Sequence, residues 1–380
     1  MTIARREFLA GLAAAGGATL LGDVGASAQQ RPRRYAKPVI DLHFHWYPKE
    51  FIDLLEKEGA ANGAIIGHDK NGNVTVKTPT SVGGGGGEGG GEGGGSPFSD
   101  KGKTDVNVML KQMDDREVDM EVVTQTNPHI IWAPPEFGAK LARAINDGNS
   151  RLYQQYPKRF MGSISLPMQD VKLSLEELER AAKMPGMRAI NVTENVRDKN
   201  LGDDEFWPIY ARCEQLGLPL FLKNVDTVHE RLIEKDYSMM NIISNPFEAT
   251  IAATSLMLSG MLDEFPKLDV YLPHAGGFFA FAIPRIAYAK DHMNAANFKH
   301  VKQPVTSYLH RFHYDLILHS PKLTRTLIDM VGADRVACGT DFPQAMAIQN
   351  PLDYVEAIPG ITKREADMIL CENPARLLKL

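Results

Sequence analysis

Two histidines separated by one residue, His43 and His45, could coordinate one metal ion together. They follow the short apolar run Pro38-Val39-Ile40, which is typical of a buried β-strand. Alternate side chains of an extended strand point the same way, so both imidazoles would leave the end of the strand together. Neutral imidazole is a common zinc ligand. The pair therefore indicates a metal site, although one histidine could instead be a hydrogen-bonded core group and the other exposed.

Short apolar runs rich in β-branched residues alternate with amphipathic stretches along the chain, and these elements must position any such site. The predicted strands are Val39–His43, Met120–Gln125, Phe160–Leu166, Arg188–Val192, Leu218–Lys223, Val270–His274, Phe312–Ile317 and Arg335–Thr340. The predicted helices include Val106–Glu117, Glu136–Tyr156, Leu173–Lys183, Asp204–Leu216, Phe247–Phe265 and Pro321–Val331. This alternation predicts an α/β fold, a (β/α)8 TIM-type barrel in a single domain over residues 29–380, rather than an open sheet.

Chemically active side chains fall where the strands of this barrel are predicted to end. Lys223 ends the fifth strand, His274 ends the sixth, and Asp341 follows the eighth. Catalytic groups of (β/α)8 barrels lie at the carboxyl ends of the strands. We therefore expect these side chains to lie near His43 and His45, where imidazole and carboxylate groups together indicate a metal-binding or catalytic site.

Composition limits the classes of function that remain. The chain has 380 residues, 43% of them hydrophobic, and a formal net charge of -5, which argues against a nucleic-acid-binding surface. No internal apolar run reaches the roughly 18 residues that a membrane-spanning helix needs. Three cysteines, Cys213, Cys338 and Cys371, are too few and too scattered for a disulfide framework.

The first 28 residues have the composition of an export signal. Arg5-Arg6 precedes the weakly apolar stretch Leu9–Leu21, and Ala26-Ser27-Ala28 is a small-x-small cleavage site. This pattern predicts a Tat signal peptide over residues 1–28, a mature chain that starts near Gln29, and a periplasmic protein with no membrane attachment after cleavage.

A second unusual segment is Gly83–Gly95, which contains eleven glycines and two glutamates. Such a run has high backbone entropy and no side chains to bury, so it predicts a flexible surface loop over about 80–103. No Gly-Lys-Ser/Thr follows, which argues against a phosphate-binding loop.

Several motifs together resemble one known family. They are His43-Phe44-His45, His274-Ala275-Gly276-Gly277 and Gly339-Thr340-Asp341-Phe342-Pro343, supported by Tyr156–Phe160 and Cys213–Pro219. From about Val39 to the carboxyl terminus the chain resembles the amidohydrolase superfamily, specifically the branch of aminocarboxymuconate semialdehyde decarboxylase and related aromatic-acid decarboxylases.

The resemblance implies a single divalent metal, usually zinc, held by His43, His45, Asp341 and a histidine at the end of the fifth strand. It also implies that His274 activates water or moves a proton, and that Asp341 belongs to the catalytic group. Where the family has the fifth-strand histidine, this chain has Lys223. A protonated lysine has no lone pair and repels a dication.

Four arrangements around Lys223 remain open. It could bind the metal as a neutral amine or a carbamate, His229 could reach the metal from the next loop, or the metal could keep more water. Alternatively, no metal binds and Lys223 forms a salt bridge with Asp341. Lys223 is also a candidate catalytic residue.

Four further residues are candidates for substrate binding. Asp315 matches a family position near the substrate, although a structural hydrogen-bonding role is an alternative. Trp46 could wall the pocket or pack in the core, and His129 follows the second strand in a predicted active-site loop. Arg285 resembles a family arginine that faces the site of a neighbouring subunit, which implies a homodimer; a surface ion pair is the alternative.

These observations predict a metal-dependent decarboxylase, a carbon–carbon lyase, of a small aromatic or unsaturated carboxylic acid. A hydrolase or hydratase with the same site is the closest alternative, since fold and motif do not separate these reactions. A metal-free barrel that only binds a ligand is an alternative of another class.

Overall fold

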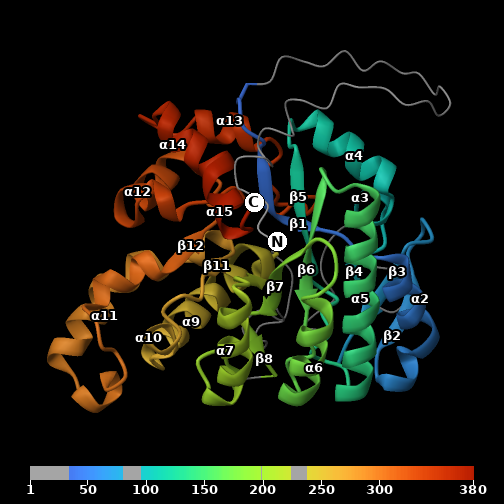
Figure 1. The fold of residues 1–380 in the computed structure, drawn as a ribbon, viewed down its shortest axis with the longest axis horizontal. Helices are drawn as coiled ribbons and strands as arrows, with labels where there is room; N and C mark the ends of the chain where they lie inside the picture. The colour runs from blue at the N-terminus through green and yellow to red at the C-terminus, as the bar shows by residue number, and fades with distance from the viewer. Residues whose placement is uncertain (1–33, 80–95, 198, 224–237) are drawn as a thin grey trace.

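The computed structural model describes residues 34–79, 96–197, 199–223 and 238–380. In these ranges, seven strands form one sheet in the order β1-β5-β6-β7-β10-β11-β12, and every neighbouring pair is parallel. The strands are β1 (Ile40–His45), β5 (Met120–Thr124), β6 (Phe160–Ser165), β7 (Met187–Thr193), β10 (Leu220–Lys223), β11 (Val270–Leu272) and β12 (Phe312–Tyr314). They lie at the centre of the molecule, with helices around them (Figure 1).

An extended segment, residues 336–342, closes this sheet. On one side the N–H of Ala337 donates to the carbonyl of Tyr314 on β12, at 2.9 Å. On the other side the N–H of Leu42 on β1 donates to the carbonyl of Cys338, also at 2.9 Å. The sheet therefore closes into the (β/α)8 barrel that the sequence predicts.

The closing segment differs from the regular strand predicted over Arg335–Thr340, because only isolated bridges form at Val336 and Phe342. Gly339 lies between these bridges and against the barrel interior. A Cβ atom at Gly339 would lie 2.0 Å from the hydroxyl of Tyr271 and 3.1 Å from the Cβ of His43. This close approach explains why the position is a glycine.

β1 contains a bulge that decides which of its side chains enter the barrel. Asp41 pairs with Glu121 and Phe44 with Val123, so three steps along β1 match two along β5. Leu42 packs with residues of opposite strands inside the barrel, whereas Phe44 packs outside against Met109 of α4. The bulge therefore lets His43 follow Leu42 into the interior.

The helices follow the strands in the alternation that the sequence predicts. Their bounds are α2 (Lys49–Glu58), α3 (Lys101–Thr104), α4 (Val106–Asp115), α5 (Pro135–Gln155), α6 (Val171–Ala181), α7 (Trp207–Leu216), α9 (Asn245–Leu258), α10 (Met261–Glu264), α11 (Phe279–His292), α12 (Pro321–Val331), α13 (Pro351–Glu356), α14 (Lys363–Asp367) and α15 (Asn373–Leu377). None of the described helices is both long and apolar enough to cross a bilayer.

Side-chain caps and glycines set several helix ends. The side chains of Asp105, Asp170 and Ser320 accept backbone N–H groups at the starts of α4, α6 and α12. The single helix predicted over Phe247–Phe265 is two helices, because Gly260 between α9 and α10 has a left-handed φ of 85°.

An insertion between β1 and β5 carries α2 and a small antiparallel sheet that the sequence did not predict. This sheet has the order β2-β3-β4, with β2 (Ile65–His68), β3 (Val74–Lys77) and β4 (Ser96–Pro97). It lies beside α2 at the right of Figure 1. The loop predicted over about 80–103 therefore ends earlier than expected, because β4 and α3 occupy residues 96–97 and 101–104. Residues 80–95 and the predicted signal peptide lie outside the described ranges.

Candidate metal and active site

Three predicted metal ligands converge at the carboxyl end of the barrel. One ligand atom each from His43, His45 and Asp341 lie within 4.8 Å of one another, and all three residues are buried. His45 Nε2 is 2.7 Å from Asp341 Oδ1, and His43 Nε2 is 3.3 Å from the same oxygen. Although it is buried, His43 Nε2 has no hydrogen bond of good geometry. A buried donor set with an unsatisfied nitrogen fits a divalent cation.

Asp315 holds two parts of this site in place. Its Oδ2 lies 3.1 Å from His43 Nδ1 and accepts the N–H of His274 at 2.9 Å. Its Oδ1 accepts the N–H groups of Ala275 and Ile317, at 2.7 and 3.0 Å. A carboxylate at Nδ1 favours the tautomer that leaves Nε2 of His43 free for a metal. The structure thus shows the hydrogen-bonding role that was the alternative for Asp315.

His274 follows β11 in an unusual backbone conformation. The φ angles of His274, Ala275, Gly276 and Gly277 are 51°, 53°, 71° and 62°. Two of these residues are not glycines, and such strain persists only where the surroundings over-determine it, most often at functional sites. The ring of His274 lies 6.1 Å from that of His43, and its Nδ1 is buried without a hydrogen-bond partner. His274 therefore places an imidazole with an unsatisfied nitrogen beside the candidate ligands.

Burial and charge set the protonation of the imidazoles. Burial lowers the pKa of His45 and that of His274 to about 4, so both rings are neutral near pH 7. Burial and Lys223 lower the pKa of His43, but hydrogen bonds with Asp315 and Asp341 outweigh them and raise it. Burial disfavours an ionised Asp341, yet the close Nε2 atoms of His43 and His45 hold its pKa well below the usual range. The site thus presents an ionised carboxylate at Asp341 and two neutral imidazoles, His45 and His274, whereas the protonated form of His43 is favoured.

Lys223 ends β10 with 1% of its surface exposed, and its Nζ has no hydrogen-bond partner. Burial lowers its pKa to about 7, against the opposing charges of Asp315 and Asp341. The salt bridge between Lys223 and Asp341, one of the four arrangements expected from sequence, is not formed, since Asp341 binds the two histidines instead. His229 lies outside the described residues.

Glu194 is a site residue that sequence reasoning missed. It directly follows β7, it is 1% exposed, and neither of its carboxyl oxygens has a hydrogen-bond partner. Burial and the charge of Glu248 raise its pKa well above the usual range, although Lys223 lowers it. Its N–H donates to the carbonyl of Lys223 at 3.1 Å. Its place after a strand was a usable signal, but no family motif marked it.

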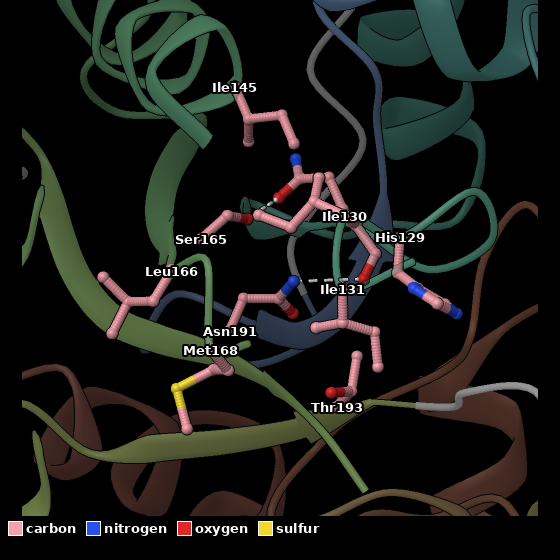
Figure 2. A pocket seen from close by; sticks show the side chains of 10 residues that line it. His129, Ile130, Ile131, Ile145, Ser165, Leu166, Met168, Asn191 and Thr193 are labelled. Atoms are coloured by element: carbon pink, nitrogen blue, oxygen red, sulfur yellow. Dashed lines mark hydrogen bonds between the residues drawn. The ribbon is translucent and has the colours of Figure 1, made fainter. Parts of the chain in front are cut away.

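A pocket lies at the carboxyl ends of β5, β6 and β7, between the strand of His43 and the strand of Lys223. Three of its polar residues form hydrogen bonds with one another, since Ser165 and Asn191 both donate to Gln125 (Figure 2). Isoleucine, leucine and methionine side chains form the rest of the wall together with His129 and Thr193. His129 therefore lines a small pocket of mixed polar and apolar character.

Two other predicted substrate residues lie elsewhere in the single chain. Trp46 packs in the apolar cluster of Phe44, Met109 and Leu152, outside the barrel, which corresponds to its predicted core alternative. Arg285 is exposed on α11, which extends from the barrel at the lower left of Figure 1, and it forms no ion pair with the described residues. The surface ion pair proposed as its alternative is therefore absent there.

The described fold and site define a (β/α)8 barrel with a candidate mononuclear metal centre. A model of the amidohydrolase family matches residues 40–380. The chain therefore belongs to the amidohydrolase family.

Several relatives of the chain are decarboxylases of the predicted branch. The chain is 28% identical to 2-amino-3-carboxymuconate-6-semialdehyde decarboxylase of Dictyostelium discoideum, over 90% of this chain and 91% of that protein. The solved IDCase of Metarhizium anisopliae superposes with a TM-score of 0.76 at 20% identity, over 90% of this chain and 97% of that one. Dihydroxybenzoic acid decarboxylase from Polaromonas, solved with manganese and 2-nitroresorcinol, gives a TM-score of 0.70 at 20% identity, over 90% and 97%. These likenesses confirm the predicted fold and branch.

The buried amine of Lys223 predicts a pH dependence of stability. Its pKa is about 7 in the folded protein and 10.5 ordinarily, so between these values the unfolded chain binds a proton that the folded chain lacks. The free energy of unfolding of metal-free protein should therefore rise between about pH 7 and 10, by up to about 1.4 kcal/mol per pH unit from this group.

Urea denaturation of metal-free wild type and Lys223→Met at several pH values measures this effect. The variant should lose that part of the slope, and exposed Lys111→Met is the matched control. An unchanged slope in Lys223→Met would contradict the depressed pKa.

Proposed function

We propose that this chain is a metal-dependent decarboxylase that acts on a small aromatic or unsaturated carboxylic acid. The observation that carries the proposal is the convergence of His43, His45 and Asp341, with His274 beside them, in a barrel whose relatives are decarboxylases.

A divalent cation held by His43, His45 and Asp341 would stabilise negative charge that develops on substrate oxygens as carbon dioxide leaves. Zinc is the ion that the ligand set predicts, and manganese is the ion printed for one solved neighbour. Both ions belong in the first loading experiments.

The side chains around the candidate metal site have separate roles in positioning, proton transfer and substrate binding. Asp315 fixes the ring of His43 and the backbone of His274. Neutral His274 has an unsatisfied Nδ1 that can accept a proton from solvent or from the substrate, and the imidazolium so formed can deliver that proton to the substrate carbon. Lys223 and Glu194 place an amine and a carboxyl group, neither one hydrogen-bonded, at the ends of neighbouring strands. These two groups are available to the carboxylate or hydroxyl groups of a substrate.

The alternatives differ in what they require of these groups. A hydrolase or hydratase would use His274 as a base toward water. In a metal-free binding barrel, protonated Lys223 would take the place of the metal and form an ion pair with Asp341, but that pair is not formed. The open donor set therefore favours an enzyme over a binding protein.

His274→Asn tests the assignment of the proton donor. The kcat for decarboxylation of 2,6-dihydroxybenzoate and other small aromatic acids should fall about 10²- to 10⁴-fold. The rate is measured as the release of carbon dioxide. Metal content, measured by elemental analysis after loading with zinc or manganese, should stay at the wild-type value. His45→Ala is the comparison that should lose the metal as well. Full activity in His274→Asn would contradict the role.

We also propose that the enzyme is a homodimer in which α11 faces the partner. The large side chains of Phe278, Phe281 and Tyr288 recur at helical spacing with 45%, 43% and 65% of their surface exposed, and Arg285 lies among them. A second copy would cover this face and could place Arg285 at the partner's site.

Complementation between variants tests this arrangement. Arg285→Ala and His274→Asn should each be inactive alone, whereas a mixture of the two should regain about a quarter of the activity, since half of the dimers are mixed and each has one intact site. Light scattering gives the mass, and a monomer with wild-type activity would contradict the arrangement.

Export through the Tat pathway is a further proposal, supported by Arg5-Arg6 and Ala26-Ser27-Ala28. Replacing both arginines with lysine should keep the protein in the cytoplasm, measured by cell fractionation. The wild type should be periplasmic, with an amino terminus near Gln29. Equal periplasmic amounts of the two proteins would refute a twin-arginine signal.

A further inference from the structure

A buried side chain outside the barrel contacts both of the segments that carry the candidate metal ligands. Arg116 follows α4, is 5% exposed, and lies behind β1 and the closing segment rather than in the active site. Its Nη2 donates to Asp41 Oδ2 at 2.8 Å and to Thr340 Oγ1 at 2.7 Å. Its Nη1 donates to Glu121 on β5 at 2.8 Å. The guanidinium thus ties together three neighbouring elements of the barrel wall.

Asp41 extends this contact to the backbone of the ligands. Its Oδ1 accepts the N–H of His43 and the N–H of Thr340, both at 3.1 Å, while Oδ2 accepts the hydroxyl of Thr340 and the guanidinium of Arg116. The carboxylate therefore binds His43 itself and the residue next to Asp341. It fixes the separation of two ligands that belong to different segments.

The backbone at Asp341 needs such support. Its φ is 64°, in the left-handed region that is strained for a residue other than glycine. The flanking residues are both held by Arg116, since Thr340 accepts its hydrogen bond and the ring of Phe342 lies 4.0 Å from its guanidinium carbon. The N–H of Asp341 also donates to the carbonyl of His43 at 2.9 Å. Contacts on both sides therefore hold Asp341 in its strained conformation.

We propose that Arg116, acting through Asp41 and Thr340, is a positioning residue that sets the distance between His43 and Asp341 and thereby the affinity of the site for its metal. This inference rests on the metal site of the proposed function. The guanidinium is suited to the role because one planar group reaches Asp41, Thr340 and Glu121 together, whereas an ammonium is a single point charge. Groups behind metal ligands typically change affinity 10- to 100-fold when they are removed.

Thr340→Val tests the inference with the smallest change, because it removes the hydroxyl that joins Arg116 to Asp41 and keeps the shape. The dissociation constant for Mn²⁺, measured on metal-free full-length protein by electron paramagnetic resonance, should rise at least about tenfold. Thr340→Ser keeps the hydroxyl, so its dissociation constant for Mn²⁺ should stay within about threefold of the wild-type value. Arg116→Lys should weaken binding like Thr340→Val.

Arg159→Lys is the matched control, because Arg159 contacts Asp114 and the carbonyl of Asp119 near the same helix but no ligand segment. The melting temperature of each metal-free variant separates loss of stability from loss of metal positioning. Lower melting temperatures with an unchanged Mn²⁺ dissociation constant in Thr340→Val and Arg116→Lys would show a purely structural role and overturn the inference.

The wild type separates this failure from a failure of the proposed function. If wild-type protein binds Mn²⁺ and the two variants bind it equally well, the positioning role is wrong and the metalloenzyme proposal stands. If the wild type binds neither Mn²⁺ nor Zn²⁺, both are wrong.

Discussion

Burial of ionisable groups at the carboxyl end of the barrel is the constraint on which the rest of this structure depends. His43, His45, Asp315 and Asp341 are all removed from water, where an unpaired charge is costly. The fold satisfies part of this demand with hydrogen bonds from backbone N–H groups to Asp315 and between His45 and Asp341. What remains unsatisfied, at His43, Lys223, Glu194 and His274, outlines the space in which a cation and a substrate are expected.

Sequence periodicity could predict the elements, because strands and helices of a barrel alternate and each buries an apolar face. It could also predict that His43 and His45 share a side, since that follows from strand geometry. The bulge in β1, in contrast, depends on pairing with β5, and the irregular closing segment depends on the approach of Gly339 to Tyr271. Those are contacts between distant parts of the chain, which periodicity does not encode.

The candidate site shows the same division. Residues in motifs were found, whereas Glu194 and Arg116 were not, because their roles come from neighbours that only the fold supplies. Trp46 follows the metal motif directly, yet its position just beyond β1 places it in the outer apolar cluster. For Trp46, proximity in sequence to the metal motif did not predict its place, because the side chain packs on the outer side of the barrel wall.

The closure of the barrel has a consequence for folding. His45 and Asp341 are 296 residues apart in the chain, and the segment that carries Asp341 must pair with β1 before the three donors can meet. Closing so long a loop is a late and entropically costly step. A nascent or truncated chain therefore has no complete binding site, and capture of the ion reports that both ends of the barrel have come together. A metal bound by these three residues would link the beginning of the chain to its end, so its loss should first weaken the pairing between β1 and the closing segment.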